Sequence, residues 1–122
     1  MLKDPYQQYK QNEVATATPG RLMLMLYNAA IKNLKLSKEG VAEKNITKVN
    51  TYMCKVQDIV LELMVSLDLT QGEVAQNLFA LYGYMHQRLV DANIKKDVDM
   101  MNEVDGMLTE LRDTWKSALL KG

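Results

Sequence analysis

The stretch of chain that follows Pro19 contains no proline, and this absence restricts the fold more than any other feature of the sequence. The two prolines of the 122-residue chain are Pro5 and Pro19. Proline breaks helix interiors because it lacks a backbone N–H and clashes with the preceding turn. Thr18 and Pro19 also form a helix start signal, since a threonine hydroxyl accepts an orphan N–H and proline is tolerated in the first turn. We therefore expect helix over most of the chain after residue 18.

One segment carries the apolar spacing of a helix packed inside a bundle. Its apolar residues recur at alternating intervals of three and four positions, at Ile46, Val49, Met53, Val56, Val60, Leu63 and Leu67. Such spacing places one continuous apolar stripe along a helix, as in bundles and coiled coils. The pattern predicts a helix over residues 42–68.

Three further helices are predicted on either side of this one. The first runs from residue 19 to about residue 36, and Gly40 is expected to lie in the connection between the first and second helices. Gly72 ends the second pattern, and the third helix then extends to residues 92–93. Its core line is Val74, Leu78, Leu81, Met85 and Leu89. Asp97 is an N-cap candidate for a fourth helix. The core line of that helix is Met101, Val104, Leu108, Leu111, Trp115 and Ala118.

The expected fold is all-α, an antiparallel up-and-down four-helix bundle with a mobile amino-terminal arm. Short connections between four helices favour antiparallel neighbours. Residues 1–18 form the predicted arm or cap, which lacks helical periodicity but carries Tyr6, Tyr9 and Val14. Residues 19–122 form the predicted bundle domain.

The first three helices carry more apolar surface than one core stripe requires. Beside its core line, the third helix has a second stripe at Ala75, Phe79, Tyr82 and Val90. The second helix has Leu61, Met64 and Val65 beside its seam, and the first is apolar nearly all round. Two interpretations stay open: a small bundle buries these flanks, or they line a groove that a partner fills. In the second case the arm is a candidate lid.

The charges and the reactive residues exclude several classes of function. Fifteen Lys and Arg balance fifteen Asp and Glu, so no global field attracts nucleic acid. The longest apolar run, residues 22–27, is far shorter than the ~20 residues that span a bilayer. Cys54 and His86 are the single residues of their types. The chain therefore has too few side chains to build a typical zinc site or a nucleophile activated by a base. We expect no catalytic, cofactor-binding or metal site, no nucleic acid, no membrane insertion, and a soluble cytoplasmic protein that is not an enzyme.

Three segments, in this order, resemble one known family. They are YQQYKQNEVATATPGRLMLMLYNAAI at residues 6–31, VQDIVLELMVSLDLTQGEVAQNLFALYGYMHQRLVDANI at 56–94 and ELRDTW at 110–115. The chain resembles the FliS family, the flagellin-specific export chaperones of the bacterial flagellum. It departs from the family pattern at Asn28 and Gly83, where an acid is expected, and where QGE replaces a double-glycine turn.

The resemblance implies a cytosolic export chaperone. Such a chaperone binds the disordered carboxy-terminal segment of flagellin, prevents premature polymerisation and keeps flagellin competent for flagellar type III secretion. Its partners would be flagellin and, through the chaperone–flagellin complex, the type III export apparatus; the chaperone itself would be a monomer or weak homodimer. The alternative is a self-associating structural helical-bundle protein, in which the second and fourth helices pair with another copy.

The resemblance also implies partner-binding positions along the chain. The arm contributes Tyr6, Tyr9 and Val14, and the first helix contributes Leu22, Leu26 and Tyr27. The second helix contributes Ile59, Leu61, Leu63, Val65 and Leu67, with Asn50 as a polar anchor for the bound backbone. The third contributes Asn77, Leu78, Leu81, Tyr82 and Tyr84. Several of these also belong to a predicted core line, so periodicity leaves open which apolar flank meets flagellin. Leu63 and Leu81 could both be wholly internal.

Overall fold

The computed structural model describes residues 19–121, which form four long helices, one short 3-10 helix and no strand. The elements are α2 (Pro19–Ala42), α3 (Ile46–Val65), η1 (Leu69–Gln71), α4 (Glu73–Lys95) and α5 (Val98–Lys121). The predicted arm lies outside the described residues, and with it the predicted binding positions Tyr6, Tyr9 and Val14.

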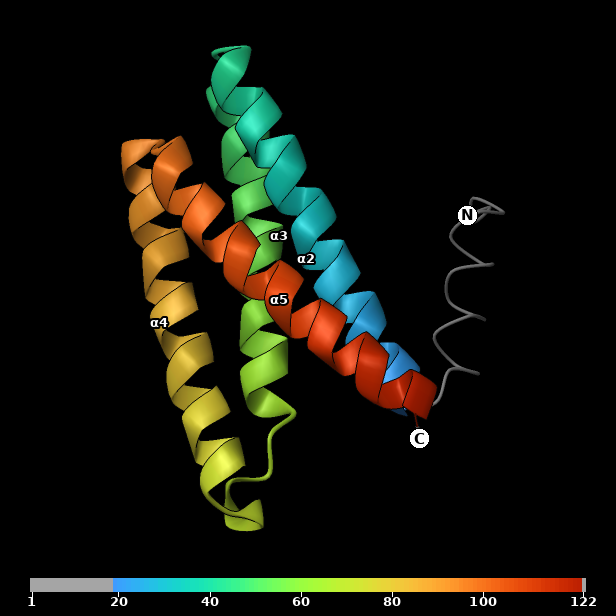
Figure 1. Ribbon diagram of the computed structural model, residues 1–122. Coiled ribbons are helices and arrows are strands. Elements are labelled where there is room, and N and C mark those ends of the chain that lie inside the picture. The colour runs from blue at the N-terminus through green and yellow to red at the C-terminus, as the bar shows by residue number, and fades with distance from the viewer. Residues whose placement is uncertain (1–18, 122) are drawn as a thin grey trace, which may run out of the picture.

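The four helices alternate in direction along the bundle (Figure 1). Each of α3 and α5 packs against both α2 and α4, so α2 and α4 lie diagonally across the core. The α2–α3 contact is the most extensive of these and the α4–α5 contact the least. Figure 1 shows the reason: α5 starts beside the end of α4 and crosses the bundle obliquely to finish beside the start of α2. The predicted all-α, up-and-down four-helix fold is confirmed.

The core follows the predicted stripes of α3 and α5 closely. Five of the seven residues of the α3 seam are buried, and the exceptions are Ile46, 64% exposed in the first turn, and Leu67, half-buried beyond the helix end. Asp97 caps the start of α5, where its Oδ1 accepts hydrogen bonds from the backbone N–H of Asp99 (2.9 Å) and of Met100 (3.2 Å). On α5 the last predicted core residue, Ala118, is exposed instead.

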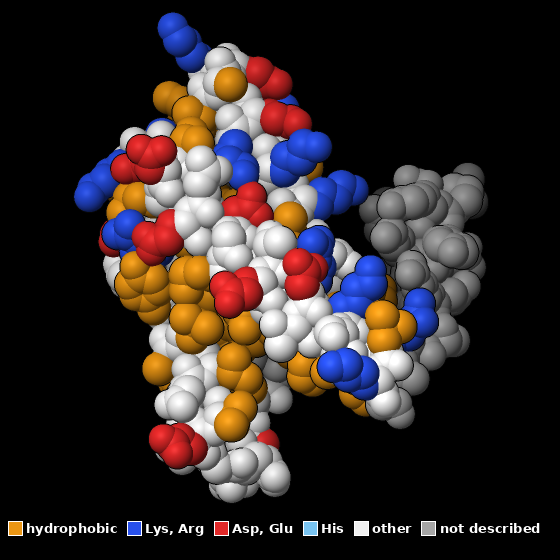
Figure 2. Space-filling view, viewed as in Figure 1, with side chains coloured by type: hydrophobic (Ala, Val, Ile, Leu, Met, Phe, Trp, Pro, Cys, Tyr) orange, Lys and Arg blue, Asp and Glu red, His pale blue; other side chains and the backbone are white. Residues whose placement is uncertain are grey.

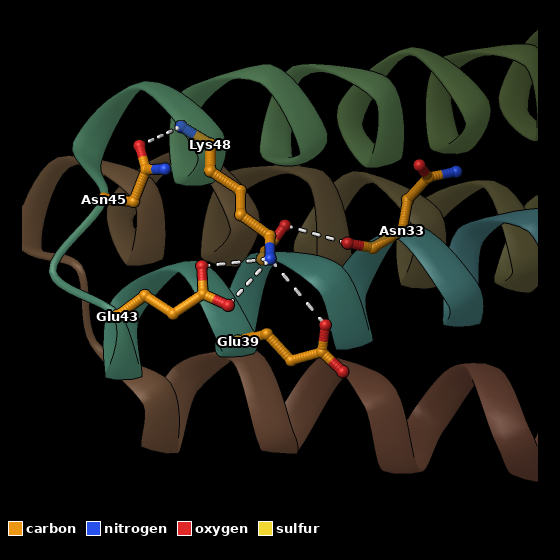
Figure 3. A network of polar contacts seen from close by, with 6 residues as sticks. Asn33, Glu39, Glu43, Asn45 and Lys48 are labelled. Atoms are coloured by element: carbon orange, nitrogen blue, oxygen red, sulfur yellow. Dashed lines mark hydrogen bonds and ion pairs between the residues drawn. The ribbon is translucent and has the colours of Figure 1, made fainter.

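The connection between α2 and α3 differs from the prediction. Gly40 does not lie in the connection but is buried within α2, which continues to Ala42. The turn comes later, at Lys44, whose φ of 55° is left-handed. Asn45 then caps α3, because its side-chain oxygen accepts from the backbone N–H of Lys48 at 3.0 Å. The ammonium of Lys48 returns to the end of α2, where it lies 3.0 Å from a carboxylate oxygen of Glu43 (Figure 3).

Close packing, not chain reversal, explains the glycine at position 40. A Cβ placed on Gly40 would lie 2.9 Å from Cγ2 of Val49 and 3.1 Å from its backbone nitrogen. Glycine therefore lets α2 and α3 approach at the point where their contact begins.

The core line of α4 also differs from the prediction in its first turns. Val74, expected in the core, is 73% exposed, whereas Tyr82, assigned to the second stripe, is fully buried beside Met85 and Leu89. The first turns of α4 lie against α3 and η1, and α5 has already diverged from them (Figure 1). A predicted core residue there meets solvent because no fourth helix covers it.

Two glycine substitutions test this packing. We expect Gly40→Ala to lower the free energy of unfolding by about 1–3 kcal/mol, because the added methyl overpacks the contact with Val49. Gly106→Ala is the matched control: Gly106 is exposed within α5, and a Cβ there meets nothing within 4 Å. That change should raise the free energy of unfolding by about 0.4–1 kcal/mol, because alanine restricts the unfolded chain. Urea denaturation of both variants measures the difference, and equal effects would contradict the assignment.

Candidate functional site

Exposed apolar side chains concentrate where α3 ends and α4 begins. Among the described residues the exposed large hydrophobic ones are Ile46, Leu61, Val65, Leu69, Val74, Phe79, Tyr84, Ile94, Leu119 and Leu120. Half of them fall within residues 61–79, which include the last turns of α3, η1 and the first turns of α4. Solvent-exposed apolar side chains in such density are typical of a surface that another molecule covers.

Half-buried side chains extend this surface toward α5. Leu78 and Leu81 of α4 and Met107 and Leu111 of α5 pack against the core without being enclosed by it. Figure 2 shows hydrophobic side chains gathered over the part of α3 and α4 from which α5 diverges. We call the residues Leu78, Leu81, Tyr84, Met107 and Leu111 the α4–α5 face.

The predicted binding residues divide into three groups by exposure. Fully buried in the core are Tyr27, Leu63 and Tyr82. Half-buried are Leu22, Leu26, Ile59, Leu67, Leu78 and Leu81. Exposed are Asn50, Leu61, Val65, Asn77 and Tyr84. The three buried residues therefore present no surface in this state, and the other residues stay predictions.

Asn50, predicted as a polar anchor, already has a partner within the fold. Its side-chain oxygen accepts from the ammonium of Lys96 at 2.6 Å. The same ammonium donates to the backbone and side-chain oxygens of Asn93, at 2.6 Å and 2.7 Å. Lys96 thus ties α3 to the left-handed end of α4 (φ 53°).

A polar cluster joins α4 to α5 beside the α4–α5 face. The hydroxyl of Tyr84 donates to Oε2 of Glu103 at 2.6 Å, and Arg88 donates to Oε1 of Glu103 from Nε (3.1 Å) and Nη2 (2.8 Å). These hydrogen bonds, first that from Tyr84 and then those from Arg88, lower the pKa of Glu103. The pKa of Tyr84 is raised, chiefly by its bond to the carboxylate. Sequence reasoning missed Arg88 and Glu103: the spacing of Tyr84 and Arg88 places them on one helix face, but only the fold adds Glu103.

Two other kinds of site, a metal-binding cluster and a membrane span, are not found in the described part of the chain. Within residues 19–121, no three or more His, Cys, Asp or Glu side chains are grouped to hold a metal ion. No helix in that range combines the length and the apolarity needed to cross a bilayer.

Comparison with known proteins shows to which family this chain belongs. The model of the family described as "Flagellar protein FliS" matches residues 2–121. This chain belongs to the FliS family. It is 42% identical over 118 residues to the flagellar secretion chaperone FliS of Bacillus subtilis (strain 168). The aligned residues cover 97% of this chain and 88% of that protein. It is 32% identical over 112 residues to the FliS of Escherichia coli (strain K12), covering 90% and 82% of the two chains.

A solved structure supports the fold independently. A bacterial flagellar chaperone crystal structure superposes with a TM-score of 0.80, covering 96% of each chain, at 20% sequence identity. Membership of the FliS family makes the protein a flagellar secretion chaperone and not an enzyme. In this FliS-family bundle the exposed apolar residues, and not a catalytic cluster, are the functional candidate.

The buried tyrosines of this FliS-family chain are linked across the core. The hydroxyls of Tyr27 on α2 and Tyr82 on α4 form a hydrogen bond with each other. Both residues are enclosed, with exposures of 2% and 0%. Burial raises the pKa of each, because the tyrosinate anion is disfavoured away from water. The pair therefore links α2 to α4 inside the core and presents no surface to a partner.

A double-mutant cycle tests this bond. Tyr27→Phe and Tyr82→Phe should each lower the free energy of unfolding by about 1–3 kcal/mol, because each leaves one buried hydroxyl without a partner. The double variant should cost clearly less than the sum of the two, because it leaves no orphan hydroxyl. Denaturant unfolding monitored by circular dichroism gives the coupling energy. Additive losses would show that the hydroxyls do not interact.

The raised tyrosine pKa values predict a loss of stability in alkali. The unfolded chain loses its tyrosine protons near pH 10, whereas the folded chain retains those of Tyr27 and Tyr82 to higher pH. The contribution of the pair is therefore complete below about pH 10 and declines as pH rises above it. The Tyr27→Phe, Tyr82→Phe double variant lacks both groups, so its free energy of unfolding should fall less steeply above about pH 10. Identical slopes for the two proteins would contradict the assignment.

Proposed function

We propose that this chaperone binds the disordered carboxy-terminal segment of flagellin on its uncovered apolar surface. Coverage of that segment would prevent premature polymerisation and keep flagellin competent for the flagellar type III export apparatus, to which the complex is delivered. Membership of the FliS family supports this proposal. The observation that carries it is the concentration of exposed apolar side chains within residues 61–79.

The geometry suits a partner that folds as it binds. An amphipathic segment can lay its apolar face on the uncovered side chains as a helix. Ordering such a segment costs conformational entropy, so a long apolar contact is needed for useful affinity. Half-buried Met64 and Met107 lie at this surface, and the unbranched methionine side chain adapts to partners of irregular shape.

Binding and self-association are separated by one titration. We expect a flagellin carboxy-terminal peptide, followed by light scattering, to form a stoichiometric heterocomplex with the chain. A homo-oligomer that grows with protein concentration, with no peptide bound, would support the self-associating structural protein and contradict the chaperone proposal.

Two matched double variants locate the surface. Leu61→Ser with Val65→Ser removes apolar side chains that are 42% and 83% exposed at the end of α3. We expect affinity for the peptide to fall by at least about tenfold, because each aliphatic side chain that the peptide fully buries contributes about 1.5–3 kcal/mol to binding. Ile46→Ser with Ile94→Ser is the control, because these residues are 64% and 74% exposed but lie at the other end of the bundle. Isothermal titration calorimetry measures both, and equal losses would contradict the location.

A further inference from the structure

We propose that Glu103 and Arg88 are positioning residues that hold the ring of Tyr84 in a single orientation for the bound flagellin segment. This inference rests on the proposed function and names the residues that prepare one part of its surface. Neither Glu103 nor Arg88 would need to touch flagellin.

The ring of Tyr84 is held at two points. Its hydroxyl donates to Oε2 of Glu103 at 2.6 Å. The guanidinium of Arg88 lies over its ring, 6.0 Å from the centroid. Arg88 is in turn fixed by two hydrogen bonds to the other carboxylate oxygen of Glu103, at 3.1 Å and 2.8 Å. One carboxylate thus restrains the aromatic side chain and the cation that covers it.

Tyr84 is nevertheless available to a partner. It remains 48% exposed, so the restraints leave much of the side chain uncovered. Leu81 precedes Tyr84 by one helical turn, and Met107 follows Glu103 by one turn on α5, so apolar side chains continue on both sides. Because the hydroxyl already has its acceptor in Glu103, a partner covering the ring does not leave that hydroxyl unsatisfied.

Restraint of an exposed aromatic ring affects affinity through entropy. A free tyrosine side chain loses rotamer freedom when a partner immobilises it, and that loss weakens binding. A ring already held in the binding orientation loses less, and rigid aromatic side chains are frequent energetic centres of interfaces. The restraint also spans two helices, because Glu103 is on α5 and Tyr84 on α4, whose contact is the least extensive of the four between neighbouring long helices.

The test is a double-mutant cycle on binding. Affinities of the full chain for a flagellin carboxy-terminal peptide are measured by isothermal titration calorimetry for Glu103→Ala, Tyr84→Ala and the double variant. We expect Glu103→Ala to weaken binding by about 3–10-fold, the entropy of one immobilised side chain. In the Tyr84→Ala background the same change should alter affinity by less than about 1.5-fold, because no ring remains to be positioned. A merely structural role of Glu103 would weaken binding equally in both backgrounds.

Two controls isolate the restraint of the ring. Glu103→Gln keeps an acceptor for the Tyr84 hydroxyl, so it should retain more affinity than Glu103→Ala. Asp105→Ala removes a different ion pair of α5, that of Asp105 with Lys38 of α2 at 2.6 Å. That pair does not touch Tyr84, so the variant should bind as the unaltered chain does. Thermal unfolding of each variant confirms that the bundle is intact.

The outcomes distinguish this inference from the proposed function. Unchanged affinity of Glu103→Ala, or an equal loss in the Tyr84→Ala background, overturns the positioning role. If the Leu61→Ser, Val65→Ser variant still loses affinity in that case, the proposed function stands without it. Absence of peptide binding by the unaltered chain overturns both.

Discussion

The hydrogen bond between Tyr27 and Tyr82 is the constraint around which the bundle is arranged. The two residues come from α2 and α4, which lie diagonally across the core because each packs on α3 and α5. An unpaired hydroxyl in an apolar core is costly, and within the described residues no buried side-chain nitrogen or oxygen lacks a partner. Sliding α2 along α4 would break this bond and leave two buried hydroxyls without a partner.

The two ends of the bundle differ in how well the helices cover one another. At one end α2 and α3 meet closely through Gly40, and Asn45 and Lys48 hold their connection (Figure 3). At the other end α5 has moved away from α4, and the side chains that a fourth helix would cover stay accessible (Figure 2). Under the proposed function, the two ends of the bundle would have different roles. The closely packed end would keep the surface in shape, and the uncovered end would supply the apolar contact that offsets the entropy of ordering a bound segment.

Sequence periodicity predicted the four long helices and most of the core stripes of α3 and α5, but it misplaced residues at the end of α2 and along α4. Gly40 was expected to break a helix because glycine has low helix propensity, yet the close approach of α3 outweighs that propensity. Val74, expected in the core, is exposed, and Tyr82, expected on the second stripe, is buried. An apolar stripe does not reveal which neighbouring helix covers it. The same reason divides the predicted binding residues by exposure: Leu61, Val65 and Tyr84 are exposed, whereas Leu63 and Tyr82 are internal. Glu103 was not predictable, since its contact with Tyr84 joins two helices.

The sequence by itself determined that the chain forms four helices, the balance of its charges and its family, because each of these depends on local spacing or on residue identity. The tertiary structure alone decided which apolar stripe is core and which is surface. That choice depends on the oblique path of α5, which covers the end of α4 and leaves its beginning open. Such a path follows from the packing of all four helices together, and the apolar pattern of a single helix does not predict it.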